Sequence, residues 1–219
     1  MKSKWMRISV WFLSLAALAV FIALYPSLPA QVPTHWGLDG AVEYHAKRNL
    51  WAFAVMPPVF AALFDLMPRI DPKKKNYEKF SRFYDGFCLF MTLFILICLL
   101  ITLSESFHPG QISVPKVMSL LLAALFIFIG NLMPKVKSNF FMGIKNPWTL
   151  SNVDVWNKTH RLGGLLMFAS GVLLLPLIFL LTSSALFAVM MALILLSVTI
   201  PSVCSYFWYK RLQSGDDPS

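Results

Sequence analysis

The chain has 219 residues, of which 58% are hydrophobic and 13% are charged, and its mean hydropathy is +0.66. An average soluble domain is about a quarter charged, so this composition excludes a soluble globular protein, and the high hydrophobicity excludes a disordered chain. The net charge of +9 fits basic loops beside anionic lipid better than a nucleic-acid surface. A polytopic membrane protein remains, for which we expect lipid as a partner and no direct contact with nucleic acid.

Six apolar segments of near-bilayer length follow one another along the chain. A helix needs about 20 apolar residues to cross a bilayer, and no segment shows the alternation of an outer-membrane barrel strand. The sequence therefore predicts an all-α polytopic membrane bundle of six transmembrane helices. We expect the first segment to be a retained span, because its 18 residues exceed the usual apolar region of a signal peptide. The segments are 8–25, 50–67, 83–103, 114–133, 162–181 and 186–208.

The basic residues between these segments lie almost entirely on one side. Sixteen of the 19 Lys and Arg fall in the two terminal tails, the second loop and the fourth loop. Cytoplasmic loops of membrane proteins carry an excess of Lys and Arg, so both termini are predicted to be cytoplasmic. The protein is then a multi-pass plasma-membrane protein whose first loop, 26–49, is extracellular.

The first loop has features of an ordered outer segment. Its prolines favour a stiff, extended lead-in, and Leu-Asp-Gly at 38–40 predicts a turn. Its polar side chains are of types that ligate zinc, but their spacing matches no known zinc motif, so no metal is predicted. A polar lid that binds a peptide or protein, and a purely structural loop, both remain open. The polar side chains are His35, Asp39, Glu43 and His45.

Two acidic residues, Asp65 and Asp85, lie near the predicted cytoplasmic ends of neighbouring spans. Charge inside a bilayer is costly, so such residues either form ion pairs at the interface or mark an ion or proton relay. Arg69 and Arg82 are the partners that the sequence offers for ion pairs.

The predicted cytoplasmic loop 134–161 is the densest site candidate. Ser151 with Asp154 resembles a capping box, so a helix starting there would run on into the fifth span. The i, i+4, i+8 spacing of Trp156, His160 and Gly164 puts them on one helix face, and Gly163-Gly164 permits close helix packing. His160 beside Arg161 is either structural, bonding a helix end, or a binding group for an anion or carboxylate.

Three stretches of this region resemble the SdpI family. They read GNLMPKVK at 130–137, FMGIKNPWTLS at 141–151 and VWNKTHRLGG at 155–164. The outer stretch from Tyr25 to Gly40 resembles an uncharacterised N-terminal domain that is often fused to that family. Lys145-Asn146 departs from the Arg-Thr expected before Pro-Trp, which keeps the charge but loses a bidentate guanidinium.

This resemblance implies a bacterial membrane immunity and signalling protein without catalysis or cofactor. Such proteins confer resistance to a secreted antimicrobial peptide, an SdpC-like toxin, and the founding member is thought to hold a transcriptional repressor at the membrane. The implied units are 1–68, with two spans, and 69–219, with four. By analogy the toxin-facing residues are His35, Trp36 and Tyr44. The cytoplasmic motif is Asn139, Lys145, Trp148, Trp156, His160 and Arg161.

Two other functions are weighed against immunity. A small transporter or permease for a peptide or lipid would need a path lined by Asp65, Asp85 or Asn131. A membrane-embedded enzyme would need converging acid, base or ligand groups. The charge asymmetry puts His35 and His160 on opposite faces, so those two histidines are not expected to share a site.

Overall fold

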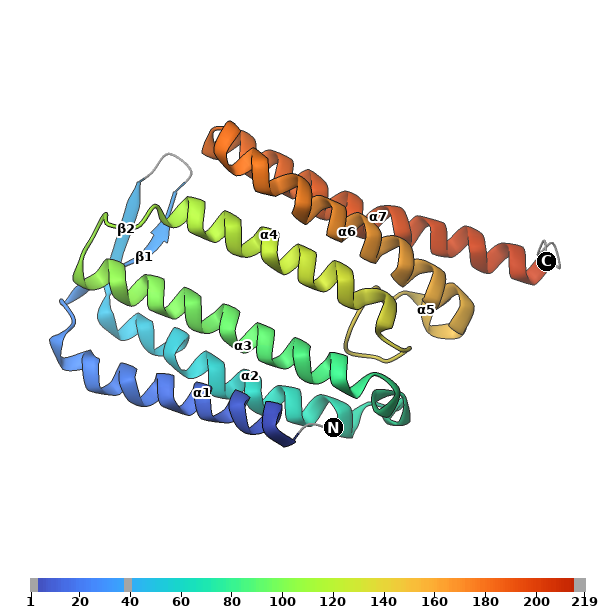
Figure 1. Ribbon diagram of the computed structural model, residues 1–219, viewed down its shortest axis with the longest axis horizontal. Helices are drawn as coiled ribbons and strands as arrows, with labels where there is room; N and C mark the ends of the chain where they lie inside the picture. The colour runs from blue at the N-terminus through green and yellow to red at the C-terminus, as the bar shows by residue number, and fades with distance from the viewer. Residues whose placement is uncertain (1–3, 38–40, 215–219) are drawn as a thin grey trace.

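Six long helices dominate the fold and run side by side in the computed structural model, which describes residues 4–37 and 41–214 (Figure 1). Each is long and apolar enough to cross a membrane, so the predicted polytopic helical bundle is confirmed. The six are α1 (Lys4–Leu24), α2 (Leu50–Ile70), α3 (Tyr77–Phe107), α4 (Val114–Leu132), α6 (Val153–Leu180) and α7 (Ser183–Ser214).

Shorter elements fill the connections between the long helices. A two-stranded antiparallel sheet, β1 (Gln31–Trp36) and β2 (Val42–Ala46), lies between α1 and α2. The short helix α5 (Pro147–Ser151) lies between α4 and α6. The four 3-10 turns are η1 (Tyr25–Ser27), η2 (Lys47–Asn49), η3 (Lys74–Asn76) and η4 (Met133–Lys135).

The long helices pack in two groups, α1 with α2 and α3, and α4 with α6 and α7 (Figure 1). In the second group, glycines bring the helix backbones together. A Cβ added at Gly130 would lie 2.4 Å from the backbone nitrogen of Phe168, and one at Gly164 would lie 2.7 Å from the carbonyl of Gly130. The close packing predicted at Gly163-Gly164 is therefore present, because no larger residue leaves room for this approach.

The β1–β2 hairpin is a feature that an all-helical reading of the sequence missed. Its register pairs Gln31 with Ala46 and Trp36 with Val42, and a bulge between Pro33 and His35 breaks the ladder. Proline in this strand is tolerated because the two-stranded sheet has only edges. The turn predicted at 38–40 lies outside the described residues.

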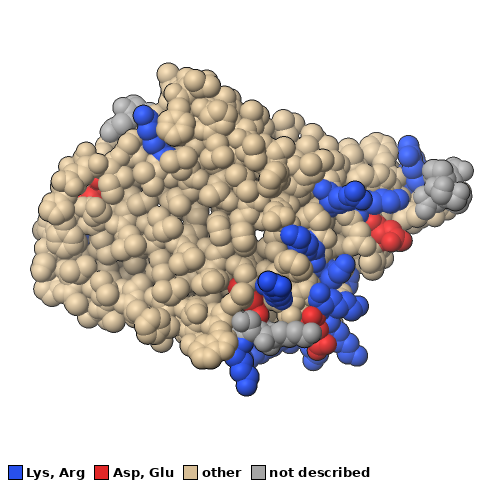
Figure 2. Space-filling model, in the orientation of Figure 1, with Lys and Arg blue, Asp and Glu red and all other residues tan. Residues whose placement is uncertain are grey.

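The hairpin and the chain termini mark opposite ends of the molecule, here called the hairpin end and the terminal end (Figure 1). Figure 2 shows that the Lys and Arg visible on one face gather mainly at the terminal end. This distribution agrees with the charge asymmetry in the sequence. Which end faces the cytoplasm stays a prediction, and so does the domain boundary at 68/69.

Three local expectations need correction. The second loop is shorter than predicted at both ends, because α2 continues to Ile70 and α3 begins at Tyr77. The helix predicted to run from Ser151 into the fifth span is present as α6, which begins at Val153. The cap of α6 is not Ser151 but Asn152, whose side chain accepts hydrogen bonds from the backbone nitrogens of residues 154 and 155.

Asp65 has a different partner from those expected. Its carboxylate accepts hydrogen bonds from the Arg7 guanidinium, with Nε at 2.9 Å, and from the Trp11 indole, also at 2.9 Å. Neither Arg69 nor Arg82 forms this ion pair. The reason is tertiary, since α1 packs beside α2 and brings a cation that is 58 residues away in sequence.

Candidate functional site

The hairpin joins the two helix groups at its end of the molecule. Val32 is fully buried and packs with Leu28 against a cluster from α1, α2 and α3. Lys47 holds the base of the hairpin, because its ammonium donates to the carbonyls of Tyr25 and Leu28 at 3.2 and 3.1 Å. Residues 34–37, at the other end of the hairpin, face α4, α6 and α7 across a groove, so the hairpin lies beside both groups.

A groove of about 320 Å³ lies where the hairpin meets the second helix group. His35, which is exposed, and Trp36, which is half-buried, form its polar and aromatic rim. Lys116 of α4 adds a cation. The rest of the wall is largely apolar and comes from the ends of α4, α6 and α7, with Met118, Leu122, Ile178, Leu186, Phe187 and Met190 among the lining residues.

Trp36 also lines a second groove of about 350 Å³, which Tyr44 borders from β2. The loop between α3 and α4 forms the other wall. Glu105 is buried there and orders the loop, because its carboxylate accepts hydrogen bonds from the backbone nitrogens of Gly110 and Ile112 at 2.8 and 2.9 Å. Trp36 therefore lines both grooves, as Val114 and Pro115 do, whereas His35 lines only the first groove and Tyr44 only the second.

The chemistry available at the hairpin end is that of noncovalent binding. The two grooves combine aromatic rings, an exposed imidazole and one ammonium on an apolar surface, which suits an amphipathic peptide. His45 is engaged within the hairpin, where its Nδ1 lies 2.6 Å from the Thr34 hydroxyl. Asp39 lies outside the described residues. Across 4–37 and 41–214, no group of three or more His, Cys, Asp or Glu is placed to hold a metal ion.

At the terminal end, Asn139 organises the loop after α4. It is fully buried, and its side-chain oxygen accepts hydrogen bonds from the backbone nitrogens of Phe141 and Met142 at 2.8 and 2.7 Å. Its amide nitrogen donates to the carbonyl of Lys137 at 2.9 Å. The side chain thus takes the place of a backbone partner in a turn, as Asn commonly does.

The loop between α2 and α3 forms hydrogen bonds with the same segment. The sequence did not predict these contacts. Asp71 is buried, and its carboxylate accepts from the Phe140 nitrogen at 2.9 Å and the Tyr77 hydroxyl at 3.1 Å. Lys73 donates to the Ser138 hydroxyl at 2.8 Å, and Asn76 donates to the Ser138 carbonyl at 2.7 Å. The only local signal was the helix stop at Asp-Pro, which says nothing about a partner over 60 residues away.

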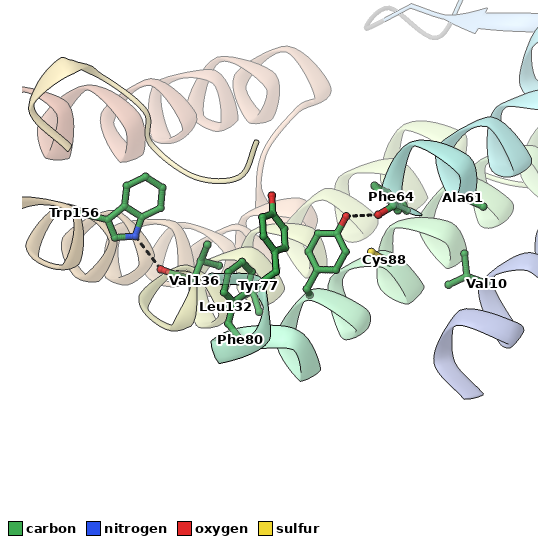
Figure 3. Close-up of a cluster of buried hydrophobic side chains, with 10 residues drawn as sticks. Val10, Ala61, Phe64, Tyr77, Phe80, Cys88, Leu132, Val136 and Trp156 are labelled. Carbon is green, nitrogen blue, oxygen red and sulfur yellow. Dashed lines mark hydrogen bonds between the residues drawn. The ribbon is translucent and has the colours of Figure 1, made fainter. Parts of the chain in front are cut away.

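Trp156 and His160 form the inner wall of this loop. Both are buried and their rings stack with centroids 3.9 Å apart. The Trp156 indole donates to the carbonyl of Val136 at 2.9 Å, as Figure 3 shows. The same hydrophobic cluster includes Tyr84, whose hydroxyl donates to the carbonyl of Phe64 at 2.6 Å. The predicted shared face of α6 is therefore a packing face.

Both ring nitrogens of His160 are engaged. Nε2 accepts from the backbone nitrogen of Ile144 at 3.1 Å, so the ring proton lies on Nδ1, which donates to the carbonyl of Trp156 at 2.8 Å. Gly143 makes this contact possible, with φ of +102° and no room for a side chain, because an added Cβ would lie 2.0 Å from Nε2. The structure places His160 as a neutral, structural group, one of the two alternatives left open by the sequence.

The short helix α5 is fixed to α7 by its first residues. Asn146 caps it, accepting from the backbone nitrogen of Thr149 at 2.9 Å, and also donates to the Ser205 hydroxyl at 2.8 Å. Trp148 packs on Tyr206 with ring centroids 5.2 Å apart. The departure from the expected Arg-Thr thus leaves a working helix cap, because Asn is also a good capping residue.

The six residues of the predicted cytoplasmic motif divide by exposure. Asn139, Trp156 and His160 are buried, so they shape the loop from within. Lys145 is exposed and donates to the carbonyls of 140 and 141, while Trp148 is half-buried. Arg161 is exposed but lines a separate groove between α4, α6 and α7.

Comparisons with known proteins fall on the same regions. Residues 135–205 match the model of the SdpI/YfhL protein family, and residues 12–61 match a domain of unknown function, DUF1648. The chain is 25% identical over 195 residues to the immunity protein SdpI of Bacillus subtilis (strain 168). The aligned region covers 89% of this chain and 91% of that protein. No solved structure gives a significant match.

Proposed function

Because residues 135–205 carry the SdpI/YfhL family region in a multi-pass bacterial membrane protein, we propose that the chain is an immunity protein against a secreted antimicrobial peptide. The likeness to the Bacillus subtilis immunity protein supports this function over nearly the full length of both chains. It acts by binding rather than by catalysis, and it needs no cofactor.

The hairpin end is the peptide-binding surface in this proposal. The observation that carries it is the pair of grooves that share Trp36, with His35 and Tyr44 on their rims. Each groove has the hairpin, which is held to the first helix group, on one side and residues of the second group on the other, so a bound peptide would contact both. Rigid aromatic anchors of this kind supply much of the affinity of protein–peptide contacts.

The terminal end is the signalling surface. Lys145 and Trp148 are its accessible motif residues, since the buried members position the loop beneath them. A cytoplasmic repressor held at the membrane would dock here, on a loop whose shape is fixed by the Asp71 and Asn139 contacts.

The permease alternative would need Asp65, Asp85 or Asn131 to line a path through the bundle, and two of these residues have other surroundings. Asp65 is occupied by Arg7 and Trp11, and Asn131 lines a groove at the terminal end. The two hairpin-end grooves share no lining residue with that groove.

A survival assay tests the proposal. The chain is expressed in a toxin-sensitive Gram-positive strain without its own immunity genes, and growth is followed with a purified SdpC-type peptide. Full protection is expected for the unsubstituted protein. The variant His35→Ala/Trp36→Ala should lower the tolerated peptide concentration at least tenfold, in line with the loss of an aromatic hot spot.

The matched control is His108→Ala, an exposed histidine at the hairpin end outside both grooves. It should protect as well as the unsubstituted protein. No protection by a membrane-inserted unsubstituted protein would refute the immunity function against this peptide. Protection that survives in the double variant would instead refute the hairpin end as the binding surface.

A further inference from the structure

A third groove, unrelated to peptide binding, lies at the terminal end between α4, α6 and α7. It encloses about 720 Å³ and is open along one side. Its floor is where Gly130 and Gly164 bring α4 and α6 together, and its walls are formed by larger side chains. The walls include Asn131, Lys135, Lys158, Arg161, Leu165, Phe168 and Trp208.

The groove changes character along its length. Lys158, Arg161, Leu165 and Phe168 follow one another on α6 at steps of three, four and three residues, so they lie on one helix face. Along this face, two cations lie at the terminal end of the helix and two exposed apolar side chains follow them. This order, charge followed by hydrocarbon, is that of a phospholipid headgroup and its acyl chain.

The cations of the groove have no acidic partner in the described part of the chain. Residues 4–37 and 41–214 contain a single ion pair, between Arg7 and Asp65. On the α4 side, the Lys135 ammonium donates a hydrogen bond to the side-chain oxygen of Asn131 at 3.0 Å. Lys158 and Arg161 are thus exposed positive charges beside an apolar wall. Trp208, a residue type enriched at membrane interfaces, lines the same groove.

We propose that this groove is a binding site for an anionic phospholipid. The phosphodiester lies between Lys158 and Arg161, with Lys135 and Asn131 on the α4 side, and an acyl chain follows Leu165 and Phe168. A guanidinium and an ammonium together suit a phosphate group, the first through bidentate hydrogen bonds and the second as a point charge. The site does not depend on the immunity function and would exist in a protein that binds no toxin.

Native mass spectrometry of the full chain, titrated with phosphatidylglycerol or phosphatidylcholine, tests the site. The unsubstituted protein should retain phosphatidylglycerol more tightly than phosphatidylcholine. The variant Lys158→Gln/Arg161→Gln should bind phosphatidylglycerol about 25-fold more weakly, because each basic residue near anionic lipid contributes about fivefold. Equal retention of both lipids by the unsubstituted protein would overturn the proposal.

Matched controls separate the groove from general surface charge. Lys74→Gln/Lys75→Gln removes two exposed cations at the same end without touching the groove, and should leave lipid binding unchanged. Leu165→Trp fills the groove without altering charge and should weaken phosphatidylglycerol binding. An equal loss in the lysine control, or unchanged binding in Leu165→Trp, would refute the groove. Displacement of the lipid by millimolar inorganic phosphate would refute the contribution of the acyl chain.

Discussion

Gly143 and His160 show how single residues set the shape of the terminal end. The loop turns at Gly143 with a backbone conformation that side chains rarely adopt, and it does so directly over the imidazole. His160 then accepts a hydrogen bond from the next residue, Ile144, while stacking on Trp156. A motif histidine that suggests chemistry in the sequence is here a fixed support for the loop.

The first prediction concerns this turn. Gly143→Ala should lower the Tm of the purified protein by about 5 °C or more, since the added methyl is strained at φ of +102° and overlaps His160. Gly86→Ala is the matched control, because no atom lies within 4 Å of the Cβ it would add and alanine favours a helix. A thermal unfolding assay in detergent that gives equal Tm values for both variants would contradict this account of the turn.

At the scale of elements, the hairpin depends on burial at its base. Val32 is fully buried among side chains from α1, α2 and α3, whereas Val42, on the partner strand, is 37% exposed. An isolated two-stranded hairpin is marginally stable in water. Its order therefore comes from docking on the helices, and the grooves at Trp36 exist only while the hairpin stays docked.

The second prediction follows from that difference. Val32→Ala should raise the hydrogen-exchange rates of backbone amides in β1 and β2 about tenfold, because deleting two buried methyl groups destabilises the docked hairpin by roughly 1–2 kcal/mol. Val42→Ala makes the same chemical change at an exposed position and should alter exchange much less. Hydrogen–deuterium exchange with mass spectrometry measures both. Similar exchange in the two variants would mean that docking does not limit hairpin opening.

At the scale of the whole molecule, positive charge is distributed unequally between the two ends. The six spans bring both termini to one end, where most of the visible Lys and Arg also lie (Figures 1 and 2). Basic residues favour the cytoplasmic side. The proposed peptide surface would then face outward, toward a secreted toxin, and the SdpI-type loop would face a cytoplasmic partner.

The third prediction tests this orientation by cysteine labelling. In a background with Cys88, Cys98 and Cys204 replaced by alanine, Glu43→Cys on the hairpin should react with a membrane-impermeant maleimide in intact cells. Lys74→Cys at the terminal end should react only after permeabilisation. Both positions are exposed in the structure, so access depends on membrane side alone. The reverse pattern would invert the assignment of the two surfaces.

The sequence by itself determined the class of protein, the six spans and the charge asymmetry. These properties depend on local composition, because lipid requires long apolar helices whatever their neighbours are. The sequence also predicted that His35, Trp36 and Tyr44 lie in the same region, since all three belong to one short loop. The motif resemblance placed the residues of the cytoplasmic loop but not their roles.

The tertiary structure decided everything that depends on residues far apart in the chain. Sequence periodicity cannot pair distant segments, and three features depend on such pairs. They are the ion pair of Asp65 with Arg7, the hydrogen bond from the Phe140 nitrogen to Asp71, and the grooves between helices. The β-hairpin was hidden as well, because its strands are short and gain stability from docking rather than from their own pattern. Burial likewise separates Trp156 and His160, which support the loop, from Lys145 and Trp148, which remain accessible to a partner.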